Sequence, residues 1–296
     1  MKAFSVLYGL LSFCEAVAIS SLAARIGNFC KAHRLRLNTD LGQHFLIDEA
    51  TLDAIIAASG LQAGERALEI GPGIGVLTER LLQAGAQVTA IELDSRMLPL
   101  LAMFTAQDGK PHPNLTVVQG NALDVPFPQE PYRIVANIPY HITSPLLRHA
   151  FLESPVPPKT LTLLIQREVA ERIADPEDRG LLTIVVALFG KARIVKHVPP
   201  NCFLPPPAVD SAVLHIDCHP APLVAADALD HVIWTLKMAF HQKRKMLRTT
   251  IGRLPGGEEA LAGADIAGDR RPQTLAPEEW INLARRLPKP SADTDA

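Results

Sequence analysis

The sequence predicts an α/β fold in which helices flank a seven-stranded, mostly parallel sheet and a small helical domain follows. Two observations predict it. From Leu41 onward, short apolar runs alternate with stretches of helical periodicity, which is typical of parallel strands joined by helices. After Asp217 a Pro-containing break, His219-Pro220-Ala221-Pro222, is followed by helical periodicity without another strand candidate.

The elements follow in chain order. Apolar runs predict strands at 66–70, 87–92, 115–119, 132–136, 160–166, 192–198 and 211–217. Helices are expected at 48–59, 76–84, 95–105, 145–152 and 167–174, with Asp48, Ser95 and Ser144 as N-caps. Beyond them, one long helical pattern has a predicted buried stripe of Ile233, Leu236, Phe240, Leu247 and Ile251. We therefore expect an N-terminal extension (1–40), a sheet domain (41–218), a helical domain (219–290) and a tail (291–296).

Composition sets limits on the class of protein. With 296 residues, 48% apolar and 20% charged, the chain is typical of a folded globular protein, not of a disordered or multi-span membrane protein. The net charge of −2 gives no overall attraction to nucleic acid, so nucleic-acid binding would need a local basic surface. The four cysteines form no C-x-x-C pair and lie near no zinc-type His spacing, which predicts free thiols, a reducing compartment and no metal.

The first 40 residues allow three explanations. The apolar stretch behind Lys2 and the Ala16-Val17-Ala18 triplet fit a signal peptide, and the Arg residues with a single early acid fit an organellar transit peptide. A start codon assigned too far upstream, or a dispensable extension, is the third. We expect a cytoplasmic protein, with organellar targeting as the alternative.

A glycine-rich loop predicts a ligand site. The first predicted strand runs into Gly71-Pro72-Gly73-Ile74-Gly75, where glycines let a ligand approach the backbone. The spacing differs from the dinucleotide fingerprint and the loop has no Lys or Arg, while the Glu69 carboxylate suits a cationic amino-acid group, as in S-adenosylmethionine. Glu92 ends the next strand, where a carboxylate can accept both ribose hydroxyls. The alternative is a tight turn without a ligand, which the placement of Glu92 disfavours.

Two further polar positions extend this site. Asn121 follows the third predicted strand, where an adenine-edge contact is usual, and its amide oxygen can accept from the adenine amine. Asn137-Ile138-Pro139-Tyr140, the tetrad, follows the fourth. The Asn137 side-chain oxygen and the backbone carbonyl of Ile138 or Pro139 could accept both hydrogens of an adenine amine, with Pro139 stiffening the turn. Tyr140 would stack on the base. A Pro-containing turn with Asn137 as its cap is the alternative.

Several motifs in this order resemble those of the ribosomal RNA adenine N6-dimethyltransferases, a class I S-adenosylmethionine-dependent, Rossmann-like family. The resemblance covers about residues 41–287. Its motifs are Gly42-Gln43-His44-Phe45-Leu46, Glu69-Ile70-Gly71-Pro72-Gly73, Ile91-Glu92-Leu93-Asp94, the tetrad, Gln166-Arg167-Glu168-Val169 and Phe203-Leu204-Pro205-Pro206-Pro207-Ala208-Val209-Asp210-Ser211-Ala212.

The resemblance implies roles for individual residues. The S-adenosylmethionine site would include His44, Leu46, Gly71, Gly73, Glu92, Asn121 and Asn137, with no metal. Catalysis would involve Asn137, Pro139, Tyr140 and Phe203, with Phe203 as a second ring surface for the base; a core Phe anchoring the Pro-rich connector is the alternative. Three departures from the family pattern are Leu37-Asn38-Thr39-Asp40 in place of basic residues, Ala208 in place of Lys and Asn121 in place of Asp.

The resemblance also implies a partner, 16S rRNA in the small ribosomal subunit or its precursor, bound by a monomer with two adjacent adenosines as targets. Residues 237–253 contain six Lys or Arg and no acid, and the predicted RNA contacts are Lys237, His241, Arg244 and Arg248. A solvated helix face is the alternative for this run. Two other functions remain open: a 23S rRNA adenine methyltransferase of the macrolide-resistance type, which the Pro-rich connector disfavours, and a ribosome-assembly or transcription factor that does not need catalysis.

Overall fold

The computed structural model describes residues 22–37, 42–175, 177, 179–242 and 244–289. The chain divides into two compact units, each treated separately below. The first comprises Met1–Ala170 and Arg193–His215, and the second comprises Glu171–Ala192 and Ile216–Ala296. The predicted boundary at 218/219 stays a prediction.

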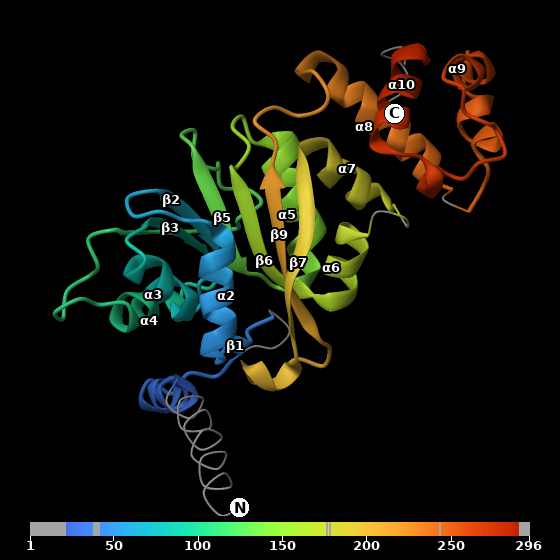
Figure 1. Cartoon of the computed structure of the whole chain (residues 1–296). Coiled ribbons are helices and arrows are strands. Elements are labelled where there is room, and N and C mark those ends of the chain that lie inside the picture. The colour runs from blue at the N-terminus through green and yellow to red at the C-terminus, as the bar shows by residue number, and fades with distance from the viewer. Residues whose placement is uncertain (1–21, 38–41, 176, 178, 243, 290–296) are drawn as a thin grey trace, which may run out of the picture. The chain divides into compact units, whose positions relative to one another are not determined.

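The central element is a seven-stranded sheet with the order β4-β3-β2-β5-β6-β9-β7 (Figure 1). Its strands are β2 (Arg66–Ile70), β3 (Gln87–Glu92), β4 (Leu115–Gln119), β5 (Tyr132–Asn137), β6 (Thr160–Gln166), β7 (Gly190–Val198) and β9 (Ser211–Cys218). All seven predicted strands are confirmed, to within two residues at each end. The neighbours from β4 to β6 pair in parallel. Because β2 has β3 on one side and β5 on the other, the strand order reverses there, and ligands of such sheets bind at the carboxyl ends beside this point.

Five helices follow the strands of the first part of the chain, close to the predicted ranges. They are α2 (Glu49–Ser59), α3 (Val76–Gln83), α4 (Met97–Phe104), α5 (Thr143–Arg148), continued by a π-helical turn (His149–Glu153), and α6 (Arg167–Ala174). Asp48 is the N-cap of α2, as predicted. The N-caps predicted at Ser95 and Ser144 are wrong. Asp94 forms the turn before α4 by accepting from the backbone N–H of Arg96 and Met97, and Ser144 lies inside α5 because a short 3-10 turn, Tyr140–Ile142, already leads into that helix.

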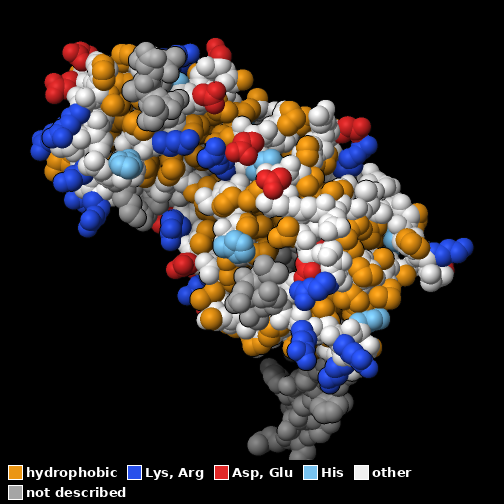
Figure 2. All heavy atoms as spheres, turned by 180° about the vertical axis from the view of Figure 1, so that it is seen from behind, with side chains coloured by type: hydrophobic (Ala, Val, Ile, Leu, Met, Phe, Trp, Pro, Cys, Tyr) orange, Lys and Arg blue, Asp and Glu red, His pale blue; other side chains and the backbone are white. Residues whose placement is uncertain are grey.

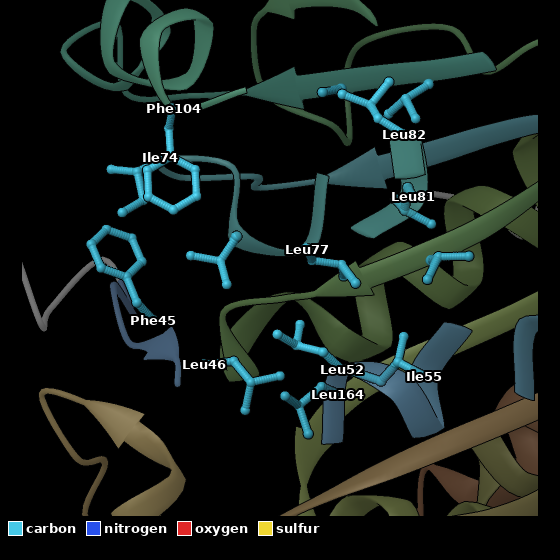
Figure 3. Close-up of a cluster of buried hydrophobic side chains, with 14 of the residues drawn as sticks. Phe45, Leu46, Leu52, Ile55, Ile74, Leu77, Leu81, Leu82, Phe104 and Leu164 are labelled. Carbon is cyan, nitrogen blue, oxygen red and sulfur yellow. The ribbon is translucent and has the colours of Figure 1, made fainter. Parts of the chain in front are cut away.

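A buried apolar cluster holds these helices to the sheet. Figure 3 shows side chains of α2, α3, β6 and β1 (Phe45–Leu46) pointing toward one another, among them Leu46, Leu52, Leu81 and Leu164. All four are at most 3% exposed. The burial of such side chains contributes roughly 1.5–3 kcal/mol each, so this cluster fixes the strand ends that carry the candidate site.

The described part of the predicted N-terminal extension belongs to this core. Residues 22–32 are helical, and Leu22 and Ile26 are buried within the same cluster. The Arg25 guanidinium pairs with Glu79 of α3 and lies 4.2 Å from the Phe104 ring centroid. Phe29 also meets the Phe104 ring edge-on, with the ring centroids 5.2 Å apart. Residues 22–32 therefore pack into the apolar core of the first unit.

A two-stranded pairing that the sequence did not predict joins distant parts of the first unit. β1 pairs antiparallel with β8 (Phe203–Leu204), with Phe45 opposite Leu204 and Leu46 opposite Phe203. The pairing brings the segment before the first large strand onto the Pro-rich connector. Strands of two residues are too short to show the alternation by which strands are predicted.

The second unit is helical apart from the strand residues it contributes. Its helices are α7 (Leu181–Phe189), α8 (Ala226–Phe240), α9 (Gly257–Gly263) and α10 (Pro277–Arg286). α7 was not predicted, since its nearly uniform apolar run, LLTIVVALF, has no period that separates a helix from a strand.

The long helical pattern predicted beyond Ile233 is wrong after Phe240. α8 ends there, and short 3-10 turns cover Leu247–Thr249 and Ile251–Arg253. The backbone N–H groups of Leu247 and Arg248 donate to the carbonyls of Arg270 and Gly268, so this segment bonds across the unit rather than within a helix. Four stripe residues are nevertheless buried, and Phe240 is half-buried.

No helix in the described ranges is both long and apolar enough to cross a membrane. Cys30, Cys202 and Cys218 are free thiols, as predicted, and Cys14 lies outside the described residues.

Candidate functional site

A cavity of about 440 Å³ opens at the carboxyl ends of β2 and β3, where the strand order reverses. This volume lies in the range of sites for small ligands and cofactors. Every residue predicted for the S-adenosylmethionine site lines it: His44, Leu46, Gly71, Gly73, Glu92, Asn121 and Asn137. We call it the donor cavity. The structure thus brings together residues that the sequence placed on five separate segments.

The glycine loop and Glu92 form one hydrogen-bonded unit. The Glu92 carboxylate accepts from the backbone N–H of Gly73 at 3.0 Å and of Asp94 at 2.8 Å. Gly73 has φ 58°, and a Cβ there would lie 2.8 Å from the Phe45 ring. Only glycine combines that backbone conformation with the close approach. Glu92 still has lone pairs for a ligand, because a carboxylate accepts about four hydrogen bonds.

The acidic groups of the donor cavity differ in the direction of their pKa shifts. Glu69 is 1% exposed, and burial raises its pKa to about 8. Burial also raises the pKa of Glu92, whereas the hydrogen bond from Arg96 holds the pKa of Asp94 at about 2. Among the described residues, none donates to Glu69 Oε2. A buried acceptor without a partner costs free energy that a ligand donor can recover, so the site fits a ligand with a cationic or N–H-bearing end near Glu69 and hydroxyls near Glu92.

A second cavity of about 360 Å³ adjoins the first. Its lining is Gly42, His44, Asn137, Ile138, Pro139, Tyr140, His141 and Gln166. We call it the base cavity. Five of these residues also line the donor cavity: Gly42, His44, Asn137, Pro139 and His141. The tetrad therefore forms a partition shared by the two cavities, since Asn137 and Pro139 line both.

Hydrogen bonds fix the orientation of the partition. Asn137 Nδ2 donates to the backbone carbonyl of His44 at 3.2 Å, which leaves Oδ1 as the end of the amide able to accept from a ligand. His44 Nδ1 lies 2.8 Å from the carbonyl oxygen of Pro205. A carbonyl only accepts, so Nδ1 carries the proton.

Pro139 and Tyr140 also lie where the tetrad hypothesis needs them. Gly42 packs on Pro139 so closely that a Cβ there would lie 2.9 Å from the proline Cβ. Tyr140 is half-buried in the base-cavity wall, and burial raises the pKa of its phenol. The phenol therefore stays neutral near pH 7.

The expectation for Phe203 finds no support. Its side chain is 2% exposed, belongs to the apolar core cluster and is absent from the lining of the base cavity. Pairing of β8 with β1 turns the ring inward beside Leu46. The alternative considered from the sequence, a core side chain anchoring the connector, describes this position.

Asn121 lines the donor cavity with its amide already engaged. Its Oδ1 accepts from the backbone N–H of Leu123 at 3.1 Å, and its Nδ2 donates to Asp124 at 3.0 Å. One lone pair of Oδ1 remains for an adenine amine.

Other lining residues were not predicted. Leu93, an apolar side chain 62% exposed, lies at the donor cavity and offers an apolar contact for a ring. Gln166 lines the base cavity at the end of β6. Both belong to motifs quoted in the sequence analysis. Leu93 directly follows β3 and Gln166 ends β6, and these strand-end positions could have identified them as lining residues.

The four predicted RNA contacts are exposed but do not lie on one helix. Lys237 lies on α8, His241 and Arg244 follow it, and Arg248 lies in the first 3-10 turn. Figure 2 shows Lys and Arg side chains gathered at the upper left of the view, over the C-terminal helices. The four residues therefore share exposure to solvent but not one helix face.

Comparison with known proteins decides the family. The family described as ribosomal RNA adenine dimethylase matches residues 34–289. The chain belongs to this family. A curated relative, the ribosomal RNA small subunit methyltransferase A of Parasynechococcus marenigrum, is 42% identical over 262 residues, covering 83% of this chain and 85% of the relative.

Two solved structures show the same fold as this family member. A dimethyladenosine transferase from Plasmodium falciparum has a TM-score of 0.70 and 28% identity, covering 80% of this chain and 94% of that one. The 23S rRNA methyltransferase ErmE has a TM-score of 0.67 and 30% identity, covering 82% and 99%. The predicted Rossmann-like methyltransferase fold is confirmed. In the described ranges, no group of three His, Cys, Asp or Glu side chains is placed to hold a metal ion.

Proposed function

We propose that this protein is an S-adenosylmethionine-dependent rRNA adenine N6,N6-dimethyltransferase acting on two adjacent adenosines in the 3′-terminal hairpin loop of 16S rRNA, in the small subunit or its precursor. One observation carries the proposal. The tetrad lies where a cavity suited to the methyl donor and a cavity suited to a planar base share lining residues, with Asn137 in the lining of both.

The donor cavity matches the polar groups of S-adenosylmethionine. Glu69 and the glycine loop would hold its amino-acid end, Glu92 its ribose hydroxyls, and Asn121 with Leu93 its adenine. His44 and Leu46 would close the cavity from β1. Bound there, the ligand supplies a methyl group on a positively charged sulfur.

The base cavity matches an adenine amine. That amine is a weak nucleophile because its lone pair is delocalised into the ring. Asn137 Oδ1 and the backbone carbonyl of Ile138 or Pro139 would accept its two hydrogens and turn the lone pair toward the donor cavity, an effect of orientation. Tyr140 would stack on the ring, which contributes about 1–3 kcal/mol in comparable sites. A target adenosine must leave its stack to enter such a cavity, and loop adenosines do so at the lowest cost.

RNA contact is proposed for Lys237, His241, Arg244 and Arg248. All four side chains are exposed and therefore accessible to a phosphate backbone. Phosphate contacts of this kind position RNA without reading its sequence. We further propose that the enzyme acts as a monomer in the cytoplasm, where precursor subunits assemble.

The relatives favour the small-subunit substrate. The curated relative named for the small subunit is 42% identical, whereas the 23S rRNA enzyme is 30% identical. The retained tetrad and Glu92 argue against a factor without catalysis.

The test is a methylation assay with purified protein, labelled S-adenosylmethionine and 30S particles from a strain lacking this modification. We expect dimethyladenosine at two adjacent positions of 16S rRNA, mapped by mass spectrometry of nuclease fragments. Naked 23S rRNA serves as the comparison substrate. Absence of dimethyladenosine in the 30S reaction would refute the proposal, and label in 23S rRNA alone would support the rival substrate.

A further inference from the structure

The Tyr140 hydroxyl has a partner that belongs to neither cavity. Tyr140 Oη lies 2.6 Å from Ser211 Oγ, a hydrogen bond in which either atom can donate. Ser211 is fully buried, is the first residue of β9 and lies 71 positions after Tyr140 in the chain. It lines neither the donor cavity nor the base cavity, so its contact with the site passes through Tyr140.

β9 itself is held firmly against β6 at this edge. The backbone N–H of Arg167 donates to the carbonyl of Asp210 at 3.0 Å, and the Arg167 guanidinium pairs with the Asp210 carboxylate at 2.8 Å. Farther along, Thr162 Oγ1 lies 3.0 Å from His215 Nδ1. Arg167, after the end of β6, meets Asp210, just before β9, and the earlier Thr162 meets the later His215. The two strands are therefore antiparallel, and β9 begins where β6 ends.

The consequence is a fixed hydroxyl next to the base cavity. Gln166, which lines that cavity, directly precedes Arg167, and Ser211 directly follows Asp210. Ser211 Oγ therefore has a set position relative to the cavity wall. A tyrosine ring turns about two side-chain torsions, and anchoring its far end at Ser211 restricts both.

We propose that Ser211 is a positioning residue for adenine methylation, which holds the Tyr140 ring in the plane that stacks on the target base. The inference rests on the proposed function and adds to it a residue that touches neither base nor donor. A tilted ring would shift the stacked base, and a shift of about 1 Å in a reacting group can lower the reaction rate on the order of 100-fold.

The test is a double-mutant cycle in the full-length protein. Tyr140→Phe keeps the ring and removes the hydroxyl, and Ser211→Ala removes the partner. We expect each single variant to lower kcat on 30S particles about tenfold, the factor that one neutral hydrogen bond supplies. The double variant should show the same tenfold loss rather than a hundredfold one, because both changes break one bond. S-adenosylmethionine affinity, measured by calorimetry, should stay within about twofold, since neither residue lines the donor cavity.

A matched pair guards against a folding defect. Ser211→Thr and Ser211→Val add side chains of nearly equal size, and only threonine keeps a hydroxyl. We expect the Thr variant to retain several-fold more kcat than the Val variant at equal thermal stability. 2-Aminopurine at the target position of the hairpin loop gives an independent signal, with weaker quenching by the Val variant than by the Thr variant.

The outcomes separate this inference from the proposed function. Wild-type protein without methylation of 30S particles refutes the function itself. Two results with an active wild type would overturn the role of Ser211 and leave the function standing. One is an equal kcat for the Thr and Val variants, and the other is a kcat loss in the double variant equal to the product of the two single losses.

Discussion

The amide of Asn137 has its orientation set by a backbone carbonyl. Because Nδ2 donates to His44, the oxygen end is the one available to a target amine. The same His44 is tied to Pro205 by its ring. The orientation of Asn137 thus depends on two distant segments, those of His44 and Pro205. Because the amide nitrogen is already hydrogen-bonded, the amide oxygen is the end that can face a ligand.

At this scale, Asn137→Ala should lower kcat on the order of 100-fold, the loss typical of removing one group that stabilises a transition state. The target amine would lose an acceptor while the stacking surface of Tyr140 remains. Single-turnover methylation of 30S particles measures the change. Thermal unfolding of the variant checks that the lost bond to His44 has not unfolded the site, and a variant with full turnover would contradict the role of Asn137.

A second prediction concerns the pH dependence of stability. The folded pKa of Glu69 is about 8, above its ordinary value of 4.5. Between these values the folded state keeps a proton that the unfolded chain releases, so Glu69 favours folding at low pH and this advantage is lost as the pH rises toward 8. Without ligand, the free energy of unfolding should fall by up to about 1 kcal/mol per pH unit in this window.

Urea unfolding at pH 5, 6, 7 and 8 tests it. Glu69→Gln should flatten the pH dependence, while Glu259→Gln, at an exposed glutamate of α9, should keep the wild-type slope. Equal slopes for wild type and Glu69→Gln would show that Glu69 is ionised in the folded protein.

At the scale of elements, the helix of residues 22–32 is part of the sheet domain. Phe29 meets Phe104 of α4, Arg25 pairs with Glu79 of α3, and Ile26 belongs to the buried apolar cluster. Ile26 is fully buried. We therefore expect this helix to contribute to the free energy of unfolding as other buried elements do.

Ile26→Ala should lower the free energy of unfolding by about 2–4 kcal/mol, the cost of a cavity in a packed core. Asn28→Ala, at an exposed position on the same helix, is the matched control and should stay within about 0.5 kcal/mol. Chemical denaturation measures both. An Ile26→Ala variant as stable as the control would show that residues 22–32 do not stabilise the fold.

The sequence predicted the strands well because parallel strands covered on both faces are continuous apolar runs, as in Tyr132–Asn137. The same property hid α7, whose run is equally apolar but helical. The donor-cavity residues were predictable because a glycine loop and strand-end carboxylates have local spacing. Phe203 was not, since its inward orientation follows from pairing with Leu46, and Ser211 was not, since its contact with Tyr140 depends on β9 lying beside β6.

At the scale of the whole molecule, a net charge of −2 coexists with a basic stretch. From Lys237 to Arg253 there are six Lys or Arg residues and no acid. Binding of RNA would therefore depend on a few local phosphate contacts, and these respond to salt in proportion to their number.

Arg244→Gln and Arg248→Gln should each weaken binding to a 16S hairpin and reduce the slope of log affinity against log salt by about 1. Arg285→Gln, an exposed arginine of α10 outside the basic stretch, is the control. Filter binding from 50 to 300 mM salt measures the slopes. Slopes equal to wild type in both test variants would place the RNA elsewhere.

The pairing of β1 with β8 has a consequence for the order of synthesis. His44 and Pro205, which meet at this pairing, are 161 positions apart, and Ser211 is translated later still. A growing chain therefore contains the tetrad well before Pro205, the partner of the His44 ring, has been translated. The partly made enzyme is therefore expected to be inactive toward the particles around it until nearly the whole sheet has been translated.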